Sequence, residues 1–379
     1  MSQKGTIVRK GRAWYLRYYD NVLKDGKPVR KKCCRKLVDH GDRYRSVKSV
    51  RVLAADFLAP LNAGKVRPES TTPVAQFIEA EYLPWTERCK RPSTVKGYKD
   101  IWEDHVKARI GLVRLRDFRP TDGTQLLATI AAHSALSRRT MYHIKSFLSG
   151  AFAQAISQGW IDSDNPMRNA RIPTGLSSPA ETDAYELAAI ERILALPELS
   201  ATARVALAVA AFTGLRKGEV RGLTWSDYRH GELRVARSVW HNHINEPKTE
   251  RSKAPVPVVP LLARMLDEYR ASRGDEREDS YVLQTRSGRP LDLDNLARRQ
   301  IIPILAVNQI PWLGWHAFRR GLATNLHSLG VDDKTIQGIL RHSSLATTQA
   351  IYIKVIQSDA HAALNRLESA LPSPAKRAN

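Results

Sequence analysis

One tyrosine near the end of the sequence, Tyr352, lies in surroundings that suggest chemistry. The stretch "LRHSSLATTQAIYIK", residues 340–354, carries an arginine, a histidine, two serines and two threonines, and then the tyrosine within an apolar "AIYI". A buried tyrosine usually packs its ring and hydrogen-bonds its hydroxyl, and this explanation would suffice if Tyr352 stood alone. The rest of the chain decides whether other reactive side chains accompany it.

Three other stretches carry side chains that can hold or cleave a phosphodiester. In "FTGLRKGEVRGLTWSD" a Thr-Gly pair interrupts a predicted helix and puts Arg216 at the start of the next turn, where Glu219 can orient the guanidinium. In "EPKTERSKAPVPV" a predicted turn puts Lys248 at the tip of a hairpin, where its ammonium group can donate a proton. In "WHAFRRGLATNL" the side chains of His316 and Arg319 share one face of a predicted helix. Each pattern is common by itself.

Together with His342 and Tyr352, these residues supply two arginines, one lysine, two histidines and one tyrosine. This set suits a phosphodiester that is attacked by a protein nucleophile rather than by metal-activated water. The guanidinium groups can neutralise the negative charge that grows on the phosphate oxygens in the transition state. A histidine can take the phenol proton, which is needed because a free tyrosine, with a pKa of about 10, is protonated at neutral pH. Lys248 can protonate the departing 5′ oxygen. A covalent phosphotyrosine keeps the energy of the broken bond, so we expect no metal ion, ATP or other cofactor.

The composition predicts a polyanionic partner. The 379 residues carry a formal net charge of +22, which points to DNA, RNA or an anionic membrane. The longest apolar run, "VALAVAAF", is far shorter than the roughly 20 residues of a membrane-spanning helix. The first residues lack the apolar segment of a signal peptide, and the three cysteines form neither a disulfide pattern nor a zinc pattern. We therefore expect a cytoplasmic protein.

The first 65 residues concentrate the positive charge. They hold 17 Lys and Arg against 5 Asp, and the basic residues alternate with aromatic and β-branched residues in "GTIVRKGRAWYLRYYD" and "GKPVRKKCCRKLVD". This pattern predicts a small β-sheet with a basic face, followed by a helix. We expect residues 1–65 to form a DNA-binding unit, with contacts from Lys31, Lys32 and Arg35.

Two further domains are predicted from changes in periodicity. Residues 72–170 show apolar spacings of three and four and are expected to form helices only, with Arg138, Arg139 and Lys145 on a basic side that could contact DNA. "RIPTGLSSPAETDAY" breaks this pattern. Residues 180–372 then mix helices with short strands, which predicts a mainly α domain of the α+β class.

The ordered motifs "TGLRKGE", "PKTERS", "HAFRR", "RHSS" and "IY" resemble the catalytic domain of the tyrosine recombinases, the phage integrase family, across about residues 180–370. The resemblance implies that Tyr352 is the nucleophile and Glu219 a supporting residue. It implies an activating set made of Arg216, Lys248, His316, Arg319 and His342. The helical segment is similar to the family's core-binding domain, which closes a clamp round the duplex, and the basic β unit is similar to its arm-binding domain.

The resemblance also implies a reaction and its partners. The expected activity is site-specific recombination of double-stranded DNA through a covalent 3′-phosphotyrosine, used to integrate or excise a mobile element. A tetramer would exchange strands at the recombination sites, and accessory DNA-bending or directionality factors are possible partners.

The sequence departs from the family pattern at three places. Arg341 stands where glycine is usual, and "HAFRR" has Ala and Arg where an acid and a second histidine are frequent. Ten positions separate His342 from Tyr352, one more than in the commonest form. A tyrosine supplied in trans by a neighbouring subunit would accommodate the longer spacing.

Three other functions fit parts of the sequence. "WHNHIN" contains His241 and His243, which would face one way on a strand and could belong to a metal-dependent nuclease, although a nearby carboxylate and helix are missing. A DNA-binding regulator without chemistry would use "GVDDKTIQGILRHSSLATTQAIY" as a helix-turn-helix, but it leaves Arg216 and Lys248 unexplained. A type IB topoisomerase-like enzyme would use the same chemistry to relax supercoils.

Overall fold

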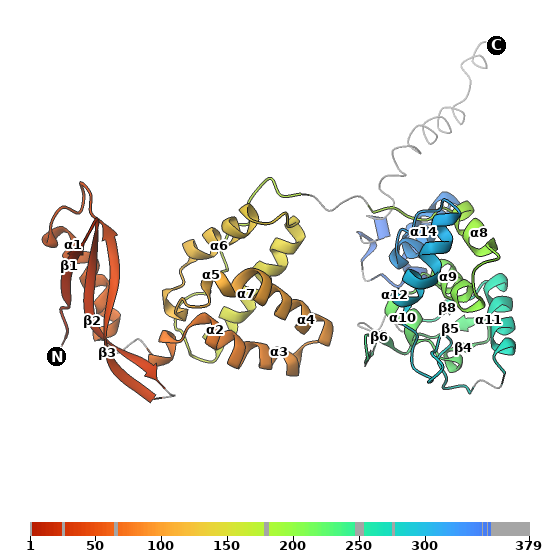
Figure 1. Cartoon of the computed structure of the whole chain (residues 1–379), viewed down its shortest axis with the longest axis horizontal. Helices are drawn as coiled ribbons and strands as arrows, with labels where there is room; N and C mark the ends of the chain where they lie inside the picture. Colours follow the sequence, from red (N-terminus) through yellow and green to blue (C-terminus); the bar gives the residue numbers. More distant parts are fainter. Residues whose placement is uncertain are drawn as a thin grey trace, which may run out of the picture. The chain divides into compact units, whose positions relative to one another are not determined.

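The computed structural model describes residues 2–24, 27–63, 67–177, 182–246, 254–274, 277–342, 344–346 and 348–349. The chain divides into two compact units, residues 1–180 and 181–379, and each has its own apolar core. Figure 1 shows the helices and strands of both units in the order of the sequence. Within the described residues, no helix is both long enough and apolar enough to cross a bilayer.

The N-terminal unit begins with the predicted β-sheet and helix. Strands β1 (Thr6–Lys10), β2 (Ala13–Lys24) and β3 (Lys27–Asp39) pair antiparallel in the order β1-β2-β3, and α1 (Val47–Asn62) follows. Successive side chains of a strand point to opposite faces, so one face of the sheet can be buried while the other stays exposed. The buried cluster consists of Leu16, Tyr18, Cys33, Ala54 and Leu58.

Ion pairs connect this sheet to the helical part of the same unit. Asp20 on β2 is 3% exposed and accepts hydrogen bonds from the guanidinium of Arg116, while Nη1 of Arg114 lies 3.8 Å from Oδ2 of the same carboxylate. The guanidinium of Arg35 on β3 donates to Asp117. The sheet is therefore held against the helical part by one buried and one half-buried ion pair.

The helical part contains two long helices assembled from shorter ones. π-helical turns at Ile78–Tyr82 and Trp102–Val106 join their neighbours into continuous helices over residues 74–89 and 92–110. Trp102 and Phe147 are fully buried at the centre of the core. The bounds are α2 (Val74–Phe77), α3 (Leu83–Cys89), α4 (Pro92–Ile101), α5 (Lys107–Ile110), α6 (Pro120–Ala132) and α7 (Arg138–Ser157), with 3-10 turns at Pro68–Thr71 and Leu115–Asp117.

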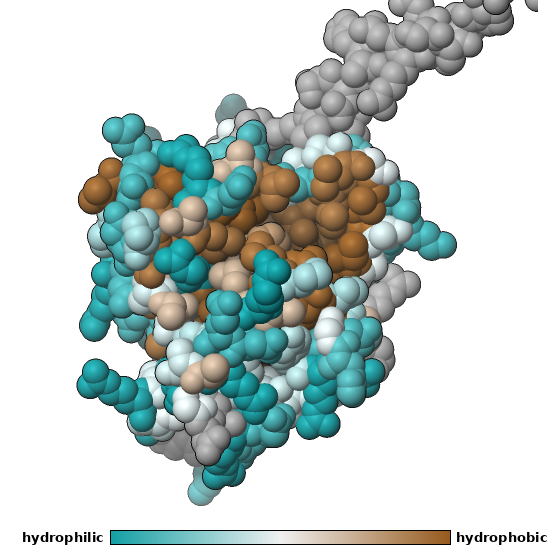
Figure 2. Space-filling view, turned by 90° about the vertical axis from the view of Figure 1, so that its right-hand side faces the viewer, coloured by the Kyte–Doolittle hydropathy of each residue, from teal (hydrophilic) through white to brown (hydrophobic). Residues whose placement is uncertain are grey.

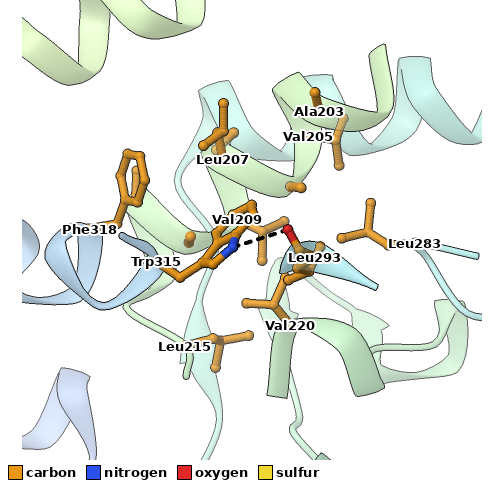
Figure 3. Packing of buried hydrophobic residues seen from close by; sticks show 14 of the residues in the cluster. Ala203, Val205, Leu207, Val209, Leu215, Val220, Leu283, Leu293, Trp315 and Phe318 are labelled. Carbon is orange, nitrogen blue, oxygen red and sulfur yellow. Dashed lines mark hydrogen bonds between the residues drawn. The ribbon is translucent and has the colours of Figure 1, made fainter. Parts of the chain in front are cut away.

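The C-terminal unit is mainly helical. Its core surrounds α9, of which nine residues are buried, and Figure 3 shows Trp315 among these side chains with its Nε1 donating to the Leu293 carbonyl at 3.3 Å. The bounds are α8 (Leu187–Ala195), α9 (Ala201–Thr213), α10 (Lys217–Gly222), α11 (Pro260–Ser272), α12 (Leu293–Leu296), α13 (Ile302–Val307), α14 (Trp315–Ser328) and α15 (Asp333–Leu340), with a 3-10 turn at Trp225–Asp227 and a π-helical segment at Ala297–Ile301.

Two small antiparallel sheets complete this unit, and they correct one prediction. The first sheet pairs its strands in the order β4-β5-β8, and the second is the β6-β7 hairpin, in which Trp240 is opposite His243. His241 lies in the hairpin turn with φ 49° rather than on a strand, so the two histidines do not alternate along one strand as predicted. The bounds are β4 (Tyr228–Arg229), β5 (Glu232–Leu233), β6 (Ser238–Trp240), β7 (His243–Asn245) and β8 (Val256–Pro257).

The surface of the C-terminal unit is uneven in polarity. Figure 2 shows one face on which apolar side chains gather, bordered by hydrophilic ones. Large apolar side chains of this unit that remain exposed include those of Leu187, Leu261 and Val307.

Candidate active site

The first predicted motif forms where α9 ends and α10 begins. Gly214 follows α9 with a φ of +60°, and a Cβ on this residue would lie 2.6 Å from Cδ2 of Leu340. A glycine is required because it accepts the left-handed conformation and permits this close approach. The turn makes Arg216 the N-cap residue of α10, with its side chain 44% exposed. The break and the position of Arg216 agree with the sequence prediction.

The carboxylate of Glu219 stabilises this turn by accepting hydrogen bonds from Arg216. Glu219 is 4% exposed, and its Oε2 accepts the backbone N–H of Arg216 at 2.9 Å while its Oε1 accepts Nη1 of Arg216 at 3.0 Å. Nη2 of Arg341 donates to Oε2 at 2.8 Å. Burial opposes ionisation of Glu219, but the nearby guanidinium groups of Arg341 and Arg216 outweigh it and lower its pKa. Glu219 is therefore a buried carboxylate that two arginines share.

The second predicted motif lies on the first turns of α14. His316 is exposed, whereas Arg319 is 1% exposed and donates hydrogen bonds to the backbone carbonyls of Gly214 and Leu340. Although part of the residue is exposed, desolvation by the surrounding protein lowers the pKa of His316, and the positive charges of Arg319, Arg320 and Arg216 lower it further. A histidine with a lowered pKa is neutral at physiological pH and can accept a proton.

The third motif follows α15. Arg341 ends the helix in the left-handed conformation, with φ 55° and ψ 43°, and is 3% exposed. His342 is 5% exposed, and its Nδ1 lies 2.8 Å from Oγ1 of the buried Thr348. Burial lowers the pKa of His342 to about 4, with further contributions from the charges of Arg319, Arg216 and His316. The three motifs lie close together, because Arg319 bonds to the carbonyls of Gly214 and Leu340 and Arg341 bonds to Glu219.

The structure thus brings together five of the predicted site residues, namely Arg216, Glu219, His316, Arg319 and His342. Lys248 and Tyr352 lie outside the described residues. In the described part of the chain, the recorded side-chain partner of Arg216 is Glu219, and the partners of Arg319 are two carbonyl oxygens. Positive charge therefore exceeds negative charge here, as binding of a phosphate requires.

Two residues of the site were not predicted as such. Arg341 was noted in the sequence only as a departure from the family pattern, and Thr348 only as part of a polar stretch. The signal for Arg341 was its type at a helix end where glycine is usual. Nothing local in the sequence could indicate its bond to Glu219, because 122 positions separate the two residues.

The residues predicted to contact DNA in the N-terminal unit fall into two groups. Lys31, Lys32, Arg138 and Arg139 are exposed, and the Arg138 guanidinium lies 5.8 Å from the centre of the Tyr142 ring. Arg35 and Lys145 are half-buried instead. Arg35 pairs with Asp117, and Nζ of Lys145 donates to the Ala170 carbonyl at 2.7 Å.

Comparison with solved structures identifies the fold. The chain aligns with the Tn1549 transposon integrase in complex with transposon right end DNA, with a TM-score of 0.63 and 20% identity over 78% of this chain and 99% of that one. It also aligns with a lambda integrase tetramer bound to a Holliday junction, with a TM-score of 0.58 and 18% identity over 91% and 93% of the two chains. The fold is that of the integrases.

Sequence comparison finds a family model and relatives that match parts of the chain. Residues 185–358 match the model of the phage integrase family. It is 32% identical over 250 residues to a protein named tyrosine recombinase XerC-like of Caldanaerobacter subterraneus subsp. tengcongensis, and the matched region covers 58% of this chain and 63% of that relative's length. An integrase of Streptomyces ambofaciens is 25% identical over 283 residues, which cover 70% of this chain and 72% of that protein.

Proposed function

We propose that this protein is a site-specific DNA recombinase that cleaves and rejoins DNA strands through a covalent 3′-phosphotyrosine at Tyr352. The observation that carries the proposal is the cluster of Arg216, Arg319, His316 and His342 around one buried carboxylate. The match of residues 185–358 to the phage integrase family model and the similarity to relatives named as recombinases and integrases support it. The role would be to integrate or excise a mobile element.

The proposed reaction divides the chemistry among the predicted residues. The Tyr352 oxygen attacks the phosphorus while its proton passes to a histidine, for which the neutral His342 or His316 is suited. Arg216 and Arg319 stabilise the charge on the non-bridging oxygens. Lys248 gives a proton to the 5′ oxygen as it leaves. In the reverse step a 5′ hydroxyl attacks the phosphotyrosine and restores the backbone, so no ATP is consumed.

Arg319 would have to change partners during this reaction. Arg319 is 1% exposed and its guanidinium donates to two carbonyls, so the described state does not offer it to solvent. Arg216 and His316 are exposed and would meet the DNA first. We propose that DNA binding opens the site enough for Arg319 to contact the phosphate.

The proposed assembly follows from the substrate. Residues 1–65 would bind accessory arm sites, residues 72–170 would clamp the core duplex and residues 180–372 would catalyse. Double-stranded recombination sites would hold a tetramer, with Tyr352 acting in cis or in trans and with accessory bending or directionality factors. The solved structures with a similar fold are complexes with transposon right end DNA and with a Holliday junction. We propose that the protein acts on DNA in the cytoplasm, at the nucleoid.

A recombination assay without metal ions tests the proposal. A plasmid that carries two copies of the candidate attachment site flanking the gene is incubated in EDTA with wild-type protein or with Tyr352→Phe. The proposal predicts recombinant products with wild type and none with the variant. Relaxation of a supercoiled plasmid without sites, in the absence of recombinants, would instead indicate a topoisomerase. Binding without either product would indicate a regulator.

A further inference from the structure

Arg341 occupies a position that is unfavourable for an arginine. It adopts φ 55°, a conformation that costs a residue with a Cβ roughly 1 kcal/mol or more, and its side chain is fully buried. Burial of a guanidinium is costly as well unless it is paired and hydrogen-bonded. Glycine would end α15 without either cost. An arginine here therefore needs an explanation beyond capping of the helix.

The contacts of Arg341 lead directly to Arg216. Nη2 of Arg341 donates to Oε2 of Glu219 at 2.8 Å, and the other oxygen of Glu219 accepts Nη1 of Arg216 at 3.0 Å. Arginine and carboxylate groups prefer a bidentate pair, with two parallel hydrogen bonds. Here one hydrogen bond joins the side chains of Arg216 and Glu219 among the described contacts. The second carboxylate oxygen, Oε2, already accepts bonds from Arg341 and from the backbone N–H of Arg216.

We propose that Arg341 is a positioning residue that acts through Glu219 to keep the guanidinium of Arg216 available to the scissile phosphate. This inference rests on the proposed recombinase function. Without Arg341, Oε2 of Glu219 can accept a second bond from the Arg216 side chain. The guanidinium of Arg216 then lies closer to the carboxylate, which neutralises more of its positive charge. Arg341 itself is buried and does not contact DNA in this arrangement.

The same bond joins the Arg216 turn to the His342 turn. Arg319 connects Gly214 to Leu340 by donating to both backbone carbonyls. Arg341, which directly precedes His342 in the chain, bonds to Glu219 of the other turn. Two ties thus link the same pair of turns. The hydrogen bonds of Arg319 must break if Arg319 contacts DNA. The bond from Arg341 to Glu219 then keeps the two turns together.

The test uses Arg341→Gly, because a merely structural role predicts that glycine is the best residue at this position. The measured quantity is the rate constant for formation of the covalent complex on a nicked duplex, in the wild-type and Arg216→Lys backgrounds. We expect Arg341→Gly to slow the reaction about tenfold in the wild-type background and to have no added effect with Arg216→Lys. Arg341→Lys should restore part of the rate.

Three outcomes would overturn the inference. A wild-type rate for Arg341→Gly would show that the arginine is dispensable, and an equal loss in both backgrounds would show that it does not act through Arg216. Recovery of the wild-type rate by Arg341→Asn, which carries no positive charge, would assign the loss in Arg341→Gly to backbone geometry. If Arg341→Gly does not fold, Arg341→Asn replaces it, since asparagine also tolerates the left-handed conformation.

A measurement that needs no turnover separates this inference from the proposed function. Binding of inorganic phosphate to the full-length protein is followed by calorimetry for wild type and Arg341→Gly. The inference predicts weaker binding to the variant by several-fold, and equal binding would overturn it. Absence of covalent complex with wild-type protein, by contrast, would contradict the recombinase proposal alone.

Discussion

Buried arginines occur in both units of this protein, and their partners differ. In the N-terminal unit Arg116 bonds the buried Asp20, and that bond raises the arginine's pKa although burial opposes it. In the C-terminal unit burial and the charge of Arg216 lower the pKa of Arg319, which bonds carbonyl oxygens. The first arrangement neutralises charge and holds two elements together. The second leaves positive charge uncompensated, as a site for a phosphate requires.

The largest expected effect on stability comes from the neutralised pair. Arg116→Ala leaves the 1% exposed carboxylate of Asp20 with Nη1 of Arg114 3.8 Å away. Loss of one partner of a buried ion pair costs about 3–5 kcal/mol, so urea denaturation should show that loss in the unfolding free energy of the N-terminal unit. The exposed pair of Lys96 and Asp100 provides the control, because Lys96→Ala should cost less than about 0.5 kcal/mol. Equal effects of the two substitutions would remove the distinction between neutralised and surface pairs.

The largest expected effect on activity comes from the site in which positive charge exceeds negative charge, which contains Arg216 and Arg319. Arg216→Gln should slow covalent-complex formation about 10²–10³-fold, because removal of one donor to transition-state charge has that effect. Its thermal unfolding should change little, since the side chain is 44% exposed. Arg192→Gln, on an exposed arginine of α8, is the matched control and should keep the wild-type rate. A loss of stability without loss of rate in Arg216→Gln would make Arg216 a structural arginine like Arg116.

The pH dependence of stability reports the electrostatics of the cluster. The pKa of His342 is lowered to about 4 by burial and by neighbouring positive charges. Between that value and about 6.5 the unfolded chain binds a proton that the folded chain does not, so stability falls as the pH is lowered through this range. His342 contributes at most about 3 kcal/mol to this loss. Chemical denaturation from pH 7 to pH 4.5 should show a shallower decline for His342→Gln, and an identical decline would contradict the proposed environment of His342.

The smallest predicted effect concerns the turn that brings Arg216 into the cluster. Gly214→Ala introduces a Cβ at φ +60°, 2.6 Å from Cδ2 of Leu340, and should destabilise the C-terminal unit by about 1 kcal/mol. Gly338, inside α15, has open space where a Cβ would lie, so Gly338→Ala should stabilise the same unit by up to about 1 kcal/mol. Thermal unfolding of both variants decides the matter, and shifts of the same sign would show that the turn does not require a glycine.

Local patterns in the sequence were sufficient for the elements that carry the site. The Thr-Gly break predicted the turn before Arg216, and the spacing of His316 and Arg319 predicted their helix, α14. Asp332 acts as the N-cap of α15, and its side chain accepts the backbone N–H groups of Lys334 and Thr335. Each of these features depends on residues within one or two helical turns of one another.

Contacts between distant parts of the chain could not be predicted in this way. The bonds from Arg319 to Gly214 and from Arg341 to Glu219 join residues more than a hundred positions apart. The prediction placed His241 on a strand, but it lies in a hairpin turn. Trp240 pairs with His243, so the turn has only two residues and does not interrupt the strand-like pattern of the sequence. The burial of Arg319, which a position on a helix face does not reveal, also emerged only from the packing of α14 against α9.

Identification of the residue that becomes linked to DNA tests the proposed chemistry most directly. A nicked duplex that spans the candidate attachment site is incubated with wild-type protein in EDTA, the complex is digested with protease and nuclease, and the modified peptide is sequenced by mass spectrometry. We expect a nucleotide attached through a 3′ phosphate to Tyr352, and no adduct with Arg216→Gln at the same time point. An adduct at another residue, or intact DNA binding without any adduct, would contradict the assignment of Tyr352 as the nucleophile.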